Sequence, residues 1–184
     1  TNNQDSVIAF NCGVCADKIK KPADALKYFD IAVQKKYNLA NAYIGKAGAL
    51  KDLKKNDEYV ATLKEGLEAV PGNKTLTKLY ATYYVNQGIL AQRAKKNSAA
   101  EEAFKQAVSI QPDNVNALNS LGSLYYNQGA TLLKTDADKA KEEFKQAKEY
   151  LDKLIPLLSA DKPAQKKMKD NANTMLNFIN SQLQ

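Results

Sequence analysis

One pattern of small and large apolar residues recurs along this chain at intervals of 34 to 41 residues. Its clearest copy is the segment L-N-S-L-G-S-L-Y at residues 118–125, whose apolar residues fall on one face of a helix. A second helix follows, with Ala140, Phe144 and Ala147 on one face. Such a helix pair cannot cover its own apolar faces, so the copies must stack on one another. The pattern therefore predicts an all-α repeat array.

The copies differ in length, but their apolar faces stay in register. Three positions of the first copy recur 34 residues later, since Ala25, Phe29 and Ala32 correspond to Tyr59, Leu63 and Gly66. The next two copies follow at intervals of 41 and 40 residues, and each carries the tripeptide Asn-Gln-Gly, at 86–88 and 127–129. The excess over 34 corresponds to about two helical turns, so it lengthens a helix without rotating its apolar face.

Turn signals between the copies give the helix boundaries. Pro22, Pro71 and Pro112 stand where helices should begin or end, and Asn114 and Asp161 are suited to cap the helices after them. We predict first helices at 6–19, 40–53, 74–94 and 115–134, and second helices at 22–36, 56–70, 98–110 and 137–154. The corresponding pairs span 6–39, 40–73, 74–114 and 115–154.

Residues 155–184 break the period and predict a separate C-terminal helix. Pro156 should end the preceding helix, and an apolar stripe at helical spacing then runs from Met168 to Leu183. The opposite face is polar, as in the capping helices that repeat arrays need at an end. No comparable cap precedes residue 6, so the first pair could dock onto further repeats or a neighbouring chain.

The order apolar-x2-Leu-Gly-x2-Tyr in 118–125, followed by Ala-x3-Phe in 140–144, resembles the tetratricopeptide repeat, with Leu118 in place of the usual Trp. The 34-residue spacing is also the period of that family. The resemblance implies a right-handed α-α superhelix of about four helix pairs plus a C-terminal capping helix. It also implies a non-catalytic scaffold that binds a peptide or protein in a concave groove.

Two sets of residues should build the core of such an array. Small residues should let the paired helices approach closely, at Gly13, Ala47, Ala81 and Gly122. Larger residues should fill the space between repeats, at Phe29, Leu63, Phe104 and Phe144. If these positions had unrelated surroundings, the repeat interpretation would be wrong.

The first helices line the groove in proteins of the resembled fold, and ten residues of this chain are candidates for that face. They are Asn11, Lys18, Asn41, Lys51, Lys78, Asn86, Asn119, Ser123, Tyr126 and Asn127. Asparagine amides can both donate to and accept from an extended peptide backbone. The three lysines would favour an acidic partner.

The chain offers few groups for catalysis or metal binding. It contains no histidine, which is the commonest general base and metal ligand. Cys12 and Cys15 form a C-x-x-C motif, but no second such motif completes a set of four zinc ligands. Because the motif falls inside a predicted helix, we expect both cysteines to be small buried apolar residues. We therefore predict no enzymatic activity, no metal site and no cofactor.

The net charge of +7 comes from lysines that alternate with acidic residues. Arg93 is the only arginine, whereas proteins that read nucleic acids favour arginine for bidentate contacts. The lysines therefore indicate solvated helix faces. A weak, lysine-rich nucleic-acid binder remains an alternative to the interaction module.

Neither a membrane span nor a leader is predicted. No apolar run approaches the ~18 residues of a membrane-spanning helix, and the start at Thr1 lacks a basic and then apolar leader. The segments Asn-Cys-Gly-Val-Cys-Ala at 11–16 and Tyr-Tyr-Val-Asn-Gln-Gly at 83–88 resemble a bacterial subgroup of these repeat proteins, many of them exported. That resemblance favours the periplasm or cell envelope over the cytoplasm. It leaves open a second alternative, a structural fragment of a larger envelope assembly.

Overall fold

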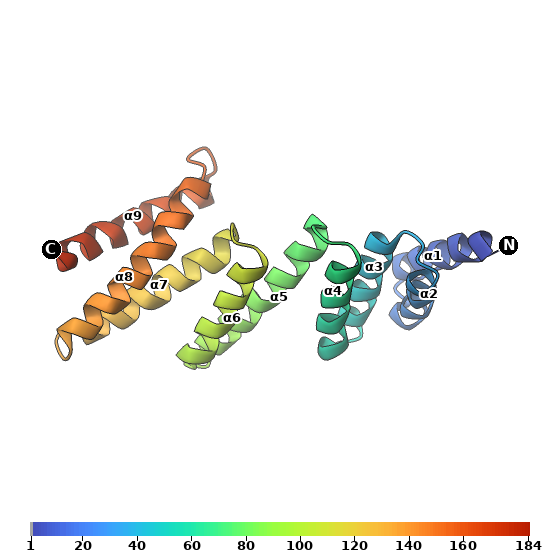
Figure 1. The fold of residues 1–184 in the computed structure, drawn as a ribbon, viewed down its shortest axis with the longest axis horizontal. Coiled ribbons are helices and arrows are strands. Elements are labelled where there is room, and N and C mark those ends of the chain that lie inside the picture. Colours follow the sequence, from blue (N-terminus) through green and yellow to red (C-terminus); the bar gives the residue numbers. More distant parts are fainter. Residues whose placement is uncertain (1) are drawn as a thin grey trace. The chain divides into compact units, whose positions relative to one another are not determined.

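The computed structural model describes residues 2–184, with side chains from Gln4 onward (Figure 1). Within these residues the regular structure is entirely helical. The α-helices are α1 (Asn2–Lys18), α2 (Pro22–Gln34), α3 (Leu39–Asp52), α4 (Asn56–Ala69), α5 (Lys74–Arg93), α6 (Asn97–Ile110), α7 (Val115–Leu132), α8 (Ala137–Leu154) and α9 (Pro163–Leu183). A 3-10 turn, η1 (Ile155–Leu157), follows α8 and contains Pro156, which confirms that this proline ends the helix.

The helix boundaries agree closely with those predicted from the sequence. The first helix begins at Asn2 rather than at residue 6, and every other predicted end lies within two residues of the observed one. Asn114 caps α7 as predicted, because its Oδ1 accepts a hydrogen bond of 3.0 Å from the backbone N–H of Ala117.

The predicted cap at Asp161 is wrong. The residue before α9 is Lys162, with Pro163 in the first turn, and no side chain caps this end. Asp161 instead belongs to the preceding turn, where its backbone N–H donates to Ser159 Oγ at 3.2 Å. Proline at the first helical position removes one of the N–H groups that a cap would otherwise satisfy.

The chain divides into two compact units, residues 1–80 and 81–184, with the division inside α5. In the first unit, Phe29 of α2 is only 3% exposed and lies against glycines of two first helices. A Cβ at Gly13 of α1 would lie 3.0 Å from the Phe29 ring, and one at Gly45 of α3 would lie 2.4 Å from it. Phe29 therefore fills the space between the first two pairs, as predicted.

The second unit has a continuous apolar core that runs from α5 to α9. Its largest fully buried side chains are Phe104, Phe144, Leu118, Leu121, Leu151, Leu154 and Ile179. The last helix, α9, covers this core with Ala172 and Ile179, both fully buried, and lies beside α8 in Figure 1. The C-terminal helix thus has the capping role that its apolar stripe predicts.

The two Asn-Gln-Gly segments place a glycine directly against a core phenylalanine. A Cβ at Gly88 of α5 would lie 2.4 Å from the Phe104 ring of α6. A Cβ at Gly129 of α7 would lie 2.8 Å from the Phe144 ring of α8. Both lengthened pairs therefore use the same close contact between a glycine and a phenylalanine, which holds the extended helix against its partner.

The turns that end α1, α3 and α5 share a feature that the sequence does not reveal. Lys20, Lys54 and Lys95 each adopt positive φ, at 58°, 59° and 57°. After α3, the N–H of Lys54 donates to Lys51 O at 3.0 Å, and the N–H of Lys55 donates to Leu50 O at 2.9 Å. This is the helix-ending arrangement in which glycine is usual. Lysine occupies it here at a conformational cost.

The prediction for the cysteines is wrong in part. Cys12 is half-buried and Cys15 is exposed, and both are free thiols. The buried positions of α1 among the described side chains are Ser6, Ala9, Gly13 and Ala16, and Cys15 lies beside that stripe rather than on it. The helical step from Cys12 to Cys15 therefore turns the second thiol toward solvent.

Candidate functional site

A stripe of small polar residues runs along the face of α7 that the core leaves free. It consists of Asn116, Asn119, Ser123 and Asn127, at helical steps of three, four and four. The opposite side of the helix is fixed in the core by Leu118 and Leu121, both fully buried. Because these leucines set the rotation of α7, the sequence determines which residues are presented on the free side.

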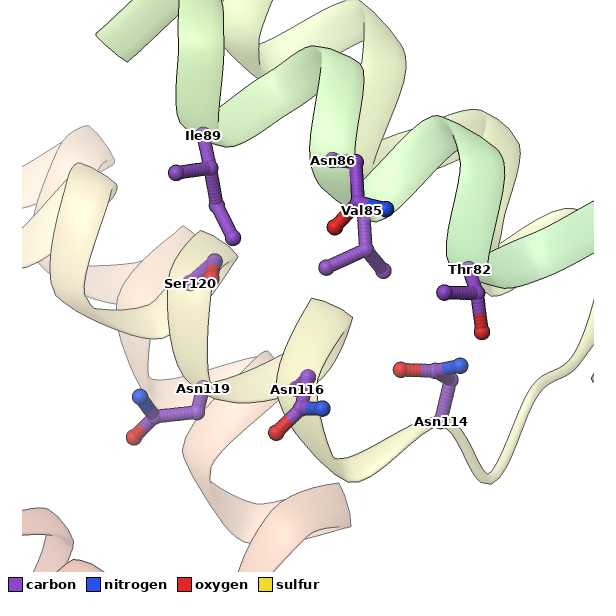
Figure 2. Close-up of a pocket in the computed structure, with 8 residues that line it drawn as sticks. All are labelled: Thr82, Val85, Asn86, Ile89, Asn114, Asn116, Asn119 and Ser120. Carbon is purple, nitrogen blue, oxygen red and sulfur yellow. The ribbon is translucent and has the colours of Figure 1, made fainter. Parts of the chain in front are cut away.

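A hollow of about 310 Å³ lies where α5 faces the start of α7 (Figure 2). Its lining residues are Thr82, Val85, Asn86 and Ile89 from α5 and Asn114, Asn116, Asn119 and Ser120 from the α7 side. Figure 2 shows Val85 and Ile89 directed toward α7, which gives the hollow an apolar wall beside its amides. The amide of Asn114 is already used, since it caps α7 and donates to Gln111 Oε1 at 3.0 Å.

A second hollow, of about 380 Å³, lies on the other side of the same stripe, between α7 and α9. It is lined by Asn119, Ser123, Tyr126, Asn127, Asn171, Thr174 and Met175. The Tyr126 ring contacts Phe144 and Phe178, at centroid distances of 6.0 and 5.7 Å, and those two rings also contact each other at 5.8 Å. Asn119 lines both hollows, so they meet on α7 and form one surface, which we call the amide face.

The residues that line the amide face carry no charge. No lining residue of the two hollows is acidic or basic, and the polar groups are carboxamides and hydroxyls. Each asparagine side chain offers two N–H donors and a carbonyl acceptor, so it can pair with both the N–H and the C=O of a peptide backbone. Such a surface can pair with main-chain N–H and C=O groups but cannot attract a partner through charge.

The structure brings together five of the ten residues that the sequence singled out. Asn86, Asn119, Ser123, Tyr126 and Asn127 all line the amide face. The other five lie exposed on the first unit and line neither hollow; they are Asn11, Lys18, Asn41, Lys51 and Lys78.

Three of the amide-face residues that were not predicted come from α9, which was assigned only a covering role. They are Asn171, Thr174 and Met175. The signal was present in the sequence, since Asn171 and Thr174 are three residues apart on the polar side of α9. Their position against α7 depends on how α9 packs, which the apolar stripe of α9 alone does not determine.

The described residues contain neither a cluster of metal ligands nor a helix suited to span a membrane. No group of three or more His, Cys, Asp or Glu side chains among them is placed to hold a metal ion. None of their helices combines the length and the apolar character needed to cross a bilayer.

The chain is strongly similar to a protein of known structure. A crystal structure of a TPR repeats protein from Bacteroides fragilis NCTC 9343 is 47% identical to this chain, and the match covers 95% of this chain and 85% of that one with a TM-score of 0.75. A family model described as TPR repeat matches residues 94–129. A search of curated proteins returned no match.

Two more distant solved structures share low identity with this chain. MamA 41-end from Desulfovibrio magneticus RS-1 is 15% identical, with 97% of this chain and 94% of that one covered and a TM-score of 0.45. YrrB, described as a TPR protein with an unusual peptide-binding site, is 17% identical, with 98% and 88% covered and a TM-score of 0.44.

Proposed function

Because the chain belongs to the tetratricopeptide repeat family, we propose that it is a non-catalytic interaction module whose amide face binds an extended segment of a protein or peptide. The α-solenoid fold class inferred from the repeat pattern is confirmed by the same relative. The observation that carries the functional proposal is the meeting of two hollows at Asn119 on α7.

The chemistry of the amide face indicates what kind of segment it would hold. An extended chain presents N–H and C=O groups that asparagine amides can pair with, and the hollows offer apolar walls for its side chains. Val85 and Ile89 supply such a wall on one side, and Met175 supplies one on the other. Since these residues sit on packed helices, little conformational entropy would be lost on binding.

The absence of charge from this lining also separates the proposal from the lysine-rich alternative. A surface without acidic or basic lining residues should bind its partner with little dependence on ionic strength. Nucleic-acid binding through lysines would instead weaken steeply as salt is added. The five exposed residues of the first unit, which include Lys18, Lys51 and Lys78, remain a separate prediction of groove residues.

The proposal can be tested with a peptide selected from a random library of extended sequences against the whole chain. We expect Asn119→Ala to weaken binding of that peptide about tenfold, because one hydrogen-bonded group shared by both hollows is lost. Asn180→Ala, at an exposed position on α9 that lines neither hollow, should bind as the wild type does. Fluorescence anisotropy at two salt concentrations measures both effects. Equal binding by wild type and Asn119→Ala would contradict the proposal.

A further inference from the structure

A third hollow, of about 420 Å³, lies between the lengthened ends of α5 and α7 and the starts of α6 and α8. Its lining residues are Gln92, Asn97, Leu124, Asn127, Gln128, Thr131, Leu132 and Glu143. Gln92, Thr131 and Leu132 all follow the glycines of the Asn-Gln-Gly segments, so the hollow depends on the extra helical turns of the two enlarged pairs. The amide face shares Asn127 with this hollow.

Two residues that line this hollow each carry a buried acceptor atom without a partner. Gln128 Oε1 and Glu143 Oε2 have no hydrogen-bond partner among the described residues. Buried acceptors are nearly always satisfied in native proteins, by the chain, by water or by a ligand. Two such atoms, on two residues that line the same hollow, point to a place where a donor from outside the chain would be stabilised.

The charges around Glu143 leave its carboxylate without a cation. Burial raises the pKa of Glu143, the negative charge of Glu101 raises it further, and Lys105 opposes the shift. However, the Lys105 ammonium already contacts Glu101 Oε1 at 2.7 Å. Among the described residues no lysine or arginine forms an ion pair with Glu143, so the hollow has an unmatched negative charge.

We propose that this hollow binds a primary alkylammonium group, as carried by a lysine side chain of a partner. An ammonium group has three donors and no acceptor, which suits a site whose two unpaired buried atoms are both acceptors. The aliphatic stem would pack on Leu124 and Leu132, which give the hollow its apolar wall. The site shares Asn127 with the amide face, but its carboxylate and its apolar wall come from other residues. It selects a partner of opposite charge to the one that the lysines of the first unit would favour.

The test uses the whole chain and two small probes that differ only in the ammonium group. N-acetyl-lysine methylamide should give saturable chemical-shift changes in the side-chain amide of Gln128 and the methyl groups of Leu124 and Leu132. N-acetyl-norleucine methylamide, which has the stem without the charge, should bind at least tenfold more weakly. If the two probes bind equally well, the hollow recognises only the apolar stem, and the proposal is overturned. The absence of saturable chemical-shift changes with the lysine probe would also overturn it.

A pair of variants on α8 identifies the charge responsible. Glu143→Gln keeps the size of the side chain and should reduce affinity for the lysine probe at least tenfold. Glu142→Gln makes the same change one residue earlier at an exposed position, where the carboxylate pairs with Lys145, and should leave the affinity unchanged. A cooperative unfolding transition for each variant excludes misfolding as the cause. If Glu143→Gln binds the lysine probe as tightly as the wild type does, the Glu143 carboxylate does not bind the ammonium group and the proposal is overturned.

Discussion

The hydroxyl of Tyr125 on α7 donates a hydrogen bond of 2.7 Å to Glu101 Oε1 on α6. Lys105 donates to the same oxygen at 2.7 Å, and its Nζ lies 5.7 Å from the centroid of the Tyr125 ring. The Tyr125 ring also stacks on Tyr150 of α8, with centroids 5.8 Å apart and planes within 1° of parallel. Burial raises the pKa of Tyr125 to about 12, against a lowering by Lys105. The cluster ties the third helix pair to the fourth.

Removing the Tyr125 hydroxyl should destabilise the protein without disturbing the ring stack. We expect Tyr125→Phe to reduce the free energy of unfolding by about 1–2 kcal/mol, because a hydrogen bond to a charged acceptor is lost. Tyr150→Phe keeps its own ring in place and should change the stability by no more than about 0.5 kcal/mol. Urea titration followed by circular dichroism measures both. A loss in Tyr150→Phe as large as that in Tyr125→Phe would contradict this assignment.

Two glutamates of the same region should give opposite pH dependences of stability. Burial raises the pKa of Glu101, but hydrogen bonds from Lys105 and Tyr125 outweigh it, and the net pKa lies below its ordinary value of 4.5. Its stabilisation is therefore complete above pH 4.5 and is lost as the pH falls through the lowered pKa. The pKa of Glu143 is raised by burial, so its contribution is complete below pH 4.5 and is lost as the pH rises through the raised pKa.

Variants separate these two effects. The relevant range is roughly pH 3 to pH 7, which brackets both titrations. Over this range the free energy of unfolding of the wild type, minus that of Glu101→Gln, should increase as the pH rises. The free energy of unfolding of the wild type, minus that of Glu143→Gln, should decrease as the pH rises over the same range. Urea titrations at closely spaced pH values measure both differences. Slopes of the same sign would show that the two carboxylates do not occupy the environments described here.

The glycines of the Asn-Gln-Gly segments should not tolerate a methyl group. We expect Gly88→Ala to destabilise the protein by about 1–3 kcal/mol, because its Cβ would lie 2.4 Å from the Phe104 ring in a filled core. Gly48→Ala is the matched control, since nothing lies within 4 Å of a Cβ placed there in the middle of α3. It should stabilise by about 0.5–1 kcal/mol through helix propensity. Thermal unfolding of the two variants should therefore shift in opposite directions.

The sequence predicts the helices well because their apolar periodicity is a local signal that the fold does not override. The same local signal places Asn119, Ser123 and Asn127 on the free face of α7. It does not show that Asn171 joins them, or that Gln128 and Glu143 meet in one hollow. Those relationships depend on how three or four helices pack around shared side chains. Sequence periodicity describes the face of one helix and not the space between several.

The left-handed lysines give the last prediction. Lys54 ends α3 with φ of 59°, a region that disfavours side chains with a Cβ and costs roughly 1–2 kcal/mol per residue. Glycine adopts this conformation freely, and the hydrogen bonds made by the N–H groups of residues 54 and 55 would be unchanged. We therefore expect Lys54→Gly to raise the free energy of unfolding by about 1 kcal/mol, even though it removes a side chain. Lys64→Gly, at an exposed position inside α4, should lower it by about 1 kcal/mol, because there the helical backbone favours lysine over glycine. If both substitutions destabilise the protein to the same extent, the turn at Lys54 does not impose the strain inferred from its φ angle. The same strain could then not be inferred for the matching turns at Lys20 and Lys95.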